Sequence, residues 1–229
     1  MPVISFASGK GGCGKTTSAT ATAFDLALDG HTVALLDCDP NGHAATIAER
    51  FRRKHADAGR RLDLRAAVSE ADIYEQIRSA RAAADFVILD LPGVASKLTL
   101  KGLTKSHLVL IPVQPSSMDA VDAARTVALI REAEETTEKA LEARFLLTRW
   151  PVLRETRVAA HTRRALDATG IATLATPFMD RTQWKELTYS GVPPRVSDPH
   201  GNAAGNLQAL VQDILAALDV AAAKAAASA

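Results

Sequence analysis

Short, nearly uniform runs of apolar residues recur along the chain, separated by longer segments in which apolar residues return every three or four positions. The runs cover residues 3–7, 32–36, 85–90, 107–113, 143–149 and 171–175. Such runs are typical of strands that are buried on both faces of a parallel sheet. The periodic segments predict helices near residues 16–28, 44–54, 69–84, 119–134, 155–169 and 207–218. This alternation predicts an α/β fold with a doubly wound, mostly parallel sheet.

Capping signals set the expected ends of several helices. Gly30 follows the first helical segment and Gly170 the fifth, and glycine is a usual residue just past a helix C-terminus. Ser69 is expected to cap the third helix, with Asp72 in a capping-box-like arrangement. The alanine-rich C-terminal segment is predicted to dock as a helix with a frayed tail from about residue 219. No linker or repeat interrupts residues 1–229, which we interpret as one domain.

A glycine-rich loop lies between the first strand and the first helix. The segment from Gly9 to Thr17 reads GKGGCGKTT and fits the Walker A spacing, in which backbone N–H groups wrap phosphate oxygens at a helix N-terminus. Lys15 is expected to reach the β- and γ-phosphates of a nucleotide, and Thr16 to offer its hydroxyl to Mg²⁺. The expected phosphate-binding residues are Gly11, Gly12, Cys13, Gly14, Lys15, Thr16 and Thr17. A glycine turn that binds nothing is the alternative, and it is disfavoured because strand, spacing, lysine, threonine and helix agree.

A second lysine makes this loop more specific. Lys10 precedes the double glycine and gives the deviant Walker A pattern Lys-Gly-Gly-x-Gly-Lys-Thr-Thr, with which the chain resembles the ParA/MinD family of dimeric ATPases. The resemblance implies that Lys10 reaches across a dimer interface to the partner's nucleotide. Lys10 is therefore grouped with Lys15 and Asp39 as a candidate catalytic residue. A lysine that is merely solvated on a loop is the alternative.

Two carboxylates follow the second strand in the sequence DCDPN. Asp37 and Asp39 are expected at the edge of the sheet where open parallel sheets bind ligands. Their spacing suits Mg²⁺ and water, and the alternative is an Asx turn that closes the strand. The segment resembles the family's switch I motif Asp-x-Asp-Pro-Gln, with Asn41 in place of the glutamine. The resemblance implies that Asp39 orients the attacking water and that Asp37 acts on the hydration shell of the metal.

The next strand also ends in a carboxylate. The apolar run before Asp90 is the Walker B arrangement, which predicts a ligand for Mg²⁺ or for a metal-bound water. The tripeptide Leu91-Pro92-Gly93 resembles the family's switch II. The loop from Gln114 to Asp119 looks most like that of the small ParF-type members of the ParA family.

Later segments are expected beside the adenine. The family places a Thr-Arg or Asn-Arg pair there, and the segment after residue 175 is expected to close over the base. The base-side candidates are Thr148, Arg149, Pro177 and Met179. Trp184 and Tyr189 follow on a helix, and ordinary packing is preferred over a nucleotide platform for them.

Composition excludes several other classes. The 229-residue chain has a net charge of +1 and two cysteines, neither in a Cys-x-x-Cys pair, so no zinc or iron–sulfur site is expected. It shows neither a signal peptide nor an uncharged apolar run of about 18 residues, and a cytoplasmic protein without a membrane partner is expected. The first strand starts at Pro2, so we expect no helix-turn-helix extension and no operator-specific autoregulation.

Basic residues occur in two regions. The cluster from Arg50 to Arg65 is interpreted as a solvated face. ParA relatives bind DNA without sequence preference through basic residues of the C-terminal half, and the resemblance implies the same here, against the default of a solvated face. The candidate DNA-binding residues are Arg154, Arg157, Arg163, Arg164, Arg181 and Lys185.

Together these features predict a P-loop ATPase that binds ATP and Mg²⁺ and forms an ATP-dependent homodimer. We expect it to bind DNA non-specifically and to drive plasmid or chromosome partition with a centromere-binding (ParB- or ParG-like) adaptor protein. It would associate with the nucleoid when ATP is bound. Hydrolysis is expected to be slow and partner-stimulated, because no arginine finger is evident near the loop. The alternatives are an ATPase that positions conjugation machinery or a protein compartment, a metabolic P-loop ligase or kinase, and a nucleotide-independent scaffold.

Overall fold

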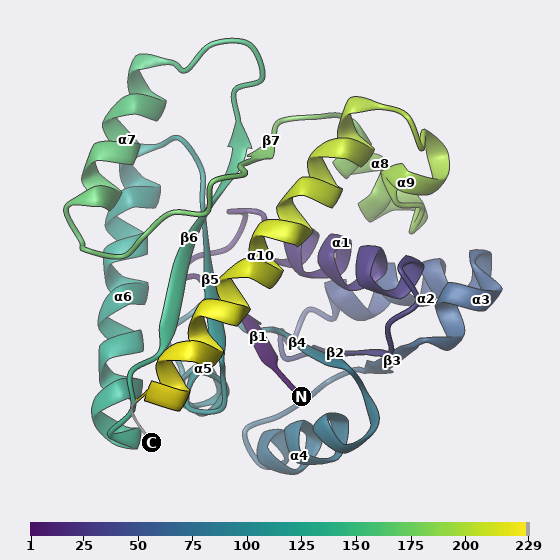
Figure 1. The fold of residues 1–229 in the computed structure, drawn as a ribbon, viewed down its shortest axis with the longest axis horizontal. Coiled ribbons are helices and arrows are strands. Elements are labelled where there is room, and N and C mark those ends of the chain that lie inside the picture. Colours follow the sequence, from purple (N-terminus) through teal and green to yellow (C-terminus); the bar gives the residue numbers. More distant parts are fainter. Residues whose placement is uncertain (228–229) are drawn as a thin grey trace.

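A seven-stranded sheet forms the centre of the protein, whose computed structural model describes residues 1–227 (Figure 1). The strand order is β3-β2-β4-β1-β5-β6-β7, and every neighbouring pair is parallel. The predicted α/β fold with a parallel sheet is therefore confirmed. The strands are β1 (Val3–Phe6), β2 (Val33–Asp37), β3 (Leu62–Arg65), β4 (Phe86–Asp90), β5 (Leu108–Val113), β6 (Glu142–Trp150) and β7 (Phe178–Met179).

Helices cover both faces of the sheet. One face carries α1 (Lys15–Leu28), α2 (His43–Lys54), α8 (Gln183–Ser190) and α10 (Asn202–Ala227). The opposite face carries α4 (Ile73–Ala83), α5 (Lys97–Leu103), α6 (Ser117–Thr137) and α7 (Arg157–Asp167). The short helices α3 (Ala56–Arg60) and α9 (Pro194–Ser197) complete the set. In Figure 1, α10 runs as the long yellow helix across the first face, whereas α6 and α7 lie together at the left.

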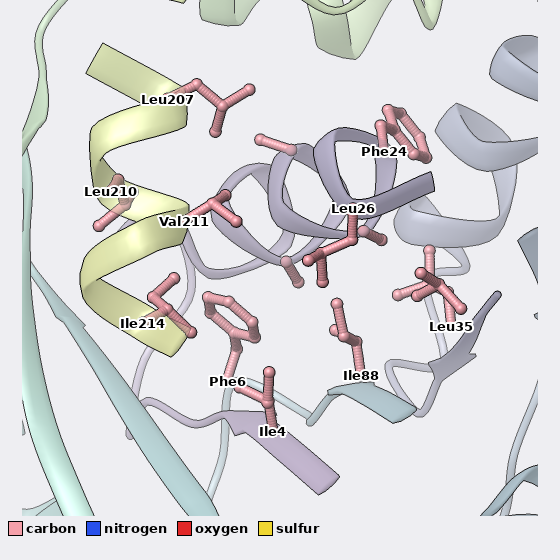
Figure 2. Packing of buried hydrophobic residues seen from close by; sticks show 14 of the residues in the cluster. Ile4, Phe6, Phe24, Leu26, Leu35, Ile88, Leu207, Leu210, Val211 and Ile214 are labelled. Carbon is pink, nitrogen blue, oxygen red and sulfur yellow. The ribbon is translucent and has the colours of Figure 1, made fainter. Parts of the chain in front are cut away.

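The alternation of side chains along β1 explains why two cores exist. Ile4 and Phe6 belong to the core under α1 and α10, whereas Val3 and Ala7 belong to the core under α4 to α7. Successive side chains of a strand point to opposite faces of the sheet, so a strand that helices cover on both faces is apolar at most positions. Figure 2 shows Ile4 and Phe6 pointing toward α1 and toward Ile214 of α10.

The sequence missed one strand and misassigned another. No strand was predicted at β3, whose alternation of charged and apolar residues hid the pairing with β2 from Leu62 to Arg65. The predicted strand at residues 171–175 is not a ladder: it makes one isolated bridge, between Phe145 and Thr173. The last strand is instead β7, two residues that pair with β6 beyond an irregularity near Thr148.

Two predicted helix ends also differ. The third predicted helix begins at Ile73, because the Asp72 carboxylate accepts hydrogen bonds from the Ser69 N–H (2.7 Å) and the Ser69 hydroxyl (2.6 Å) and folds the preceding residues into a turn. The C-terminal helix α10 continues past residue 219 to Ala227, and the frayed tail stays a prediction. Lys224 contributes to this, since its ammonium lies 2.7 Å from the Glu142 carboxylate at the start of β6.

Candidate nucleotide site

The glycine loop lies where the central strand β1 passes into α1. Gly12 and Gly14 have φ angles of 85° and 93°, which L side chains rarely adopt. Gly14 is also the N-cap residue of α1, so the first N–H groups of this helix face the loop without a side-chain cap. Free N–H groups at a helix N-terminus form a ready site for phosphate. The local geometry is thus that of a phosphate-binding loop.

Lys15 and Thr16 meet Asp90 at the carboxyl end of β4. The Lys15 ammonium donates to one oxygen of Asp90 at 2.7 Å, and the Thr16 hydroxyl donates to the other at 2.7 Å. Asp90 is fully buried, and burial raises its pKa against the opposing effects of Lys15 and Thr16. A buried carboxylate that is satisfied on both oxygens by a cation and a hydroxyl is tightly held in place.

Asp37 lies beside Asp90, its register partner on β4. The two oxygens of Asp37 accept hydrogen bonds from the backbone N–H groups of Asp39 (3.1 Å) and Ala45 (2.8 Å), and burial raises the pKa of this carboxyl. Asp37 therefore closes the turn after β2 and holds the first turn of α2. These hydrogen bonds agree with the Asx-turn interpretation, and the metal-side role of Asp37 stays a prediction.

Asp39 is more accessible than its neighbour. Its side chain accepts hydrogen bonds from the Asn41 N–H (3.0 Å) and the Asn41 amide (2.8 Å), and it lies 3.9 Å from the Lys15 ammonium. Burial pushes the pKa of Asp39 upward, but the Asn41 hydrogen bonds and the Lys15 charge outweigh it and hold the pKa below its usual range. Asp39 is therefore an ionised acceptor at the mouth of the site, a suitable group for orienting water.

Lys10 is engaged within its own chain. Its ammonium lies 2.6 Å from Asp119 and 4.0 Å from Asp122, both near the start of α6, and the hydrogen bond to Asp119 raises the pKa of Lys10. The sequence motif drew attention to the loop that contains Asp119 but gave this residue no role. Lys10 and Asp119 are separated by 109 positions along the chain, so only the fold reveals the contact.

Three further residues support the loop. The Gln114 amide donates to the Gly12 carbonyl, and the Thr148 hydroxyl donates to the Cys13 carbonyl at 2.6 Å. A Cβ atom on Gly93 would lie 3.2 Å from the Gly11 nitrogen, so the switch II glycine packs directly on the loop backbone. Gln114 and Gly93 were missed as site residues, although both lie in motifs that the sequence singled out.

The base-side candidates occupy different environments. Thr148 is buried and its hydroxyl is used by the Cys13 carbonyl, whereas Arg149 is exposed with a φ of 48°. Asn206 of α10 donates to the Pro177 carbonyl (2.9 Å) and accepts from the Met179 N–H (3.1 Å), which fixes that segment. The Trp184 ring stacks on Phe178 with centroids 4.1 Å apart, as the packing interpretation expects, and Tyr189 is 83% exposed.

The candidate DNA-binding residues do not form one helix face. Arg157, Arg163 and Arg164 lie on α7, which packs against the α6 side of the sheet, whereas Lys185 lies on α8, which packs on the opposite side. Arg163 is also paired with Glu155 at 3.0 Å and lies over the Trp150 ring. Part of the predicted basic surface is therefore committed to contacts within the chain.

The oxygen donors at this edge fit a magnesium ion that is shared with phosphates. Thr16 and Asp90 supply a hydroxyl and a carboxylate, with Asp37 beside them. No group of three or more His, Cys, Asp or Glu side chains that could hold a metal occurs among residues 1–227. Mg²⁺ is usually bound by one or two carboxylates, water and substrate phosphates, which is the donor set that Thr16 and Asp90 would complete.

The family model described as the CobQ/CobB/MinD/ParA nucleotide binding domain matches residues 4–185, most of the chain. The chain belongs to this family. Its ParA/MinD members include the protein ParA of Rhizobium radiobacter, 29% identical over 91% of this chain and 92% of that protein. The maintenance of carboxysome distribution protein A of Halothiobacillus neapolitanus is 29% identical over 80% of this chain and 82% of that protein.

A solved ParA/MinD structure confirms the fold. The septum site-determining protein MinD of Pyrococcus horikoshii, complexed with Mg-ADP, superposes with a TM-score of 0.73 at 18% identity and covers 93% of this chain and 95% of MinD. The family model and the similarity to ParA of Rhizobium radiobacter confirm the predicted membership in the ParA/MinD family of P-loop ATPases, although a special closeness to ParF-type members is not shown. No helix within residues 1–227 has the length and apolar character needed to cross a membrane.

Proposed function

We propose that this protein is a ParA-type partition ATPase, which binds Mg·ATP, dimerises around it, binds DNA non-specifically and moves a plasmid or chromosome with a centromere-binding adaptor. The observation that carries the proposal is the convergence of Lys15, Thr16 and Asp90 at the loop that also bears Lys10. The similarity to ParA of Rhizobium radiobacter over nearly the whole chain supports it.

Each site residue has a role that follows from its chemistry. Lys15 is a cation at a helix N-terminus, where it would bind the β- and γ-phosphates. Thr16 and Asp90 would hold Mg²⁺, with Asp37 beside its hydration shell, and the ion would neutralise charge on the phosphates. Asp39 is ionised and would accept a hydrogen bond from the attacking water.

The proposal includes slow ATP hydrolysis by the isolated protein. Within residues 1–227, no arginine forms an ion pair with Asp39 or Asp90. An arginine that stabilises transferred charge raises the turnover of P-loop NTPases by about 10³–10⁵. We expect the isolated protein to hydrolyse ATP slowly and an adaptor together with DNA to stimulate it.

Lys10 supports the dimeric part of the proposal. ATP carries several negative charges, and two protomers that close over two nucleotides need cations at the interface. The Lys10 side chain is one-third exposed, whereas its partner Asp119 is buried. It would exchange Asp119 for the partner's nucleotide when the dimer forms. The exposed α7 residues Arg157 and Arg164 would then face DNA from both protomers, and the protein would associate with the nucleoid.

Three variants test this function. Purified protein should bind an ATP analogue, dimerise with it as measured by light scattering, and turn over far below one ATP per second without DNA or adaptor. Asp39→Ala should bind ATP but not hydrolyse it, Lys15→Ala should lose tight binding, and Lys10→Ala should bind as a monomer. Rapid turnover by the protein alone, or a Lys10→Ala protein that dimerises normally, would contradict the proposal.

A second cargo is supported by one observation. The carboxysome distribution protein of Halothiobacillus neapolitanus matches 80% of this chain, so the same ATPase cycle would serve a protein compartment. The two cargoes differ in the adaptor that stimulates hydrolysis: a DNA-binding protein encoded nearby supports partition, and a compartment-binding protein supports positioning. A metabolic P-loop enzyme would instead turn over with a small molecule alone.

A further inference from the structure

The last turn of α2 and the short helix α3 bring basic side chains together. Arg52 and Arg53 lie on α2, and Arg60 lies at the end of α3; all three are exposed. They surround an open hollow of ≈ 470 Å³, which we call the arginine hollow. Its lining residues are Glu49, Arg52, Arg53, Ala56, Gly59 and Arg60. In Figure 1, α2 and α3 lie at the right of the molecule, at the opposite side from α7.

A glycine makes this arrangement possible. Gly59 is buried, and a Cβ atom at this position would lie 2.8 Å from both the Cα and the carbonyl oxygen of Arg52. The backbone of α3 therefore rests directly on the backbone of α2 at Arg52. Phe51 anchors the same turn, since its ring stacks on Phe24 of α1 with centroids 4.1 Å apart. The backbone that carries these arginines is therefore held in place by its packing.

The positive charges of the hollow are largely uncommitted. Among residues 1–227, Arg52 and Arg53 form no ion pair or side-chain hydrogen bond, and Arg60 has one pair, with the highly exposed Asp57 at 3.7 Å. Glu49 is the one acidic side chain of the lining. Arg52 and Arg53 thus leave an excess of positive charge over Glu49 in the lining, and such an excess favours a bound anion. By contrast, Arg163 on α7 already pairs with Glu155.

We infer that the arginine hollow binds the phosphodiester backbone of duplex nucleic acid, as a second contact surface apart from α7. A guanidinium presents a planar fork that matches phosphate oxygens, which suits arginine better than lysine for this contact. No large hydrophobic side chain between residues 43 and 65 is exposed, which disfavours an apolar partner such as a lipid surface. The inference goes beyond the proposed function, which places DNA on the C-terminal half.

The test compares duplex binding by matched double variants. Fluorescence anisotropy with unrelated duplexes is measured at several salt concentrations, with a slowly hydrolysed ATP analogue, for the full-length protein. Arg52→Ala/Arg53→Ala should weaken binding at least tenfold at low salt and should reduce the slope of log K against log salt by roughly 1.8, since each neutralised phosphate contributes roughly 0.9. Arg78→Ala/Arg131→Ala removes the same charge from other exposed helices and should change affinity less than threefold.

Two further measurements distinguish the ways in which the inference could fail. Glu49→Gln should strengthen duplex binding, because it removes the acidic lining residue without truncating an arginine. Tripolyphosphate should compete only at millimolar concentration; stoichiometric displacement at micromolar concentration would make the hollow a small-polyphosphate site and overturn the inference. Unchanged affinity and slope in Arg52→Ala/Arg53→Ala, with loss in Arg157→Ala/Arg164→Ala, would also overturn it and leave the proposed function standing. Equal thermal melting of all variants excludes unfolding as the cause.

Discussion

The proposed dimerisation would depend on a carboxylate within the same chain, because Asp119 holds Lys10 at 2.6 Å. In Asp119→Asn, the amide oxygen can still accept the Gln114 N–H, which lies 3.2 Å from Asp119, but the charge that holds Lys10 is removed. Lys10 must leave this partner before it can reach a nucleotide across an interface. We therefore expect Asp119→Asn to dimerise more tightly with ATP than the wild-type protein.

The expected change in the dimer dissociation constant follows from the exposure of the two side chains and from the number of such contacts in a dimer. Lys10 is 33% exposed and Asp119 is 5% exposed, so the pair lies between a surface ion pair and a buried charge-assisted hydrogen bond. Allowing for solvent screening, the lost attraction is about 1 kcal/mol per protomer. Two such contacts break in each dimer, and the dissociation constant should fall about 30-fold, since about 1.4 kcal/mol corresponds to tenfold.

Analytical ultracentrifugation with a slowly hydrolysed ATP analogue measures this constant directly. Asp122→Asn is the matched control: Asp122 lies 4.0 Å from Lys10 and bonds mainly to Arg125 at 2.9 Å, so this variant should shift the constant less than threefold. The reasoning is refuted if Asp119→Asn dimerises as the wild type does. A weaker dimer would show that Asp119 itself contributes to the interface.

Three further predictions concern stability and the loop. Asp25 is buried with one oxygen lacking a hydrogen bond, and burial raises its pKa to about 6, against the opposing charge of Arg195. Between pH 3.8 and about 6 the native state therefore binds more protons than the unfolded chain. The free energy of unfolding falls as the pH rises through this window, by at most about 3 kcal/mol. Asp25→Asn should lack this loss when urea titrations at pH 4 and pH 7 are compared. Gly93→Ala should weaken nucleotide binding several-fold with little change in melting temperature, because the added methyl would press on the Gly11 nitrogen at 3.2 Å; unchanged calorimetric affinity would show that the loop yields freely. Gly205 lies inside α10, and a Cβ atom at this position would have no other atom within 4 Å. Gly205→Ala should therefore raise the free energy of unfolding by about 0.5–1 kcal/mol. A decrease would show that a methyl group does not fit at this position.

The features that the sequence predicted correctly are local ones. A strand, a glycine loop with fixed spacing and a helix follow one another between Val3 and Leu28, so neighbouring residues carry the whole signal. The buried strands β4 and β5 were visible for the same reason, as continuous apolar runs. β3 escaped because Asp63 and Arg65 alternate with leucines at the edge of the sheet, where half of the strand is solvated.

The features that the sequence missed depend on the fold. Lys10 finds Asp119 only because β1 and β5 are neighbours in the sheet, which brings the loop beside the start of α6. The basic residues of the C-terminal half looked continuous along the chain, yet the chain crosses from one face of the sheet to the other between α7 and α8. Charge counted along a sequence therefore does not give charge on a surface.

The two hydrogen bonds accepted by Asp37 join the two parts of the molecule for which we propose nucleotide binding and nucleic-acid binding. One holds Asp39 beside the phosphate loop, and the other holds Ala45 in the first turn of α2, the helix whose last turn carries Arg52 and Arg53. A bound nucleotide that moved Asp39 would act on the same carboxylate that holds the first turn of this helix. Coupling free energies are reciprocal. If nucleotide changes the affinity of α2 for a polyanion by some factor, the polyanion must change nucleotide affinity by that same factor, and long DNA becomes an effector of ATP binding.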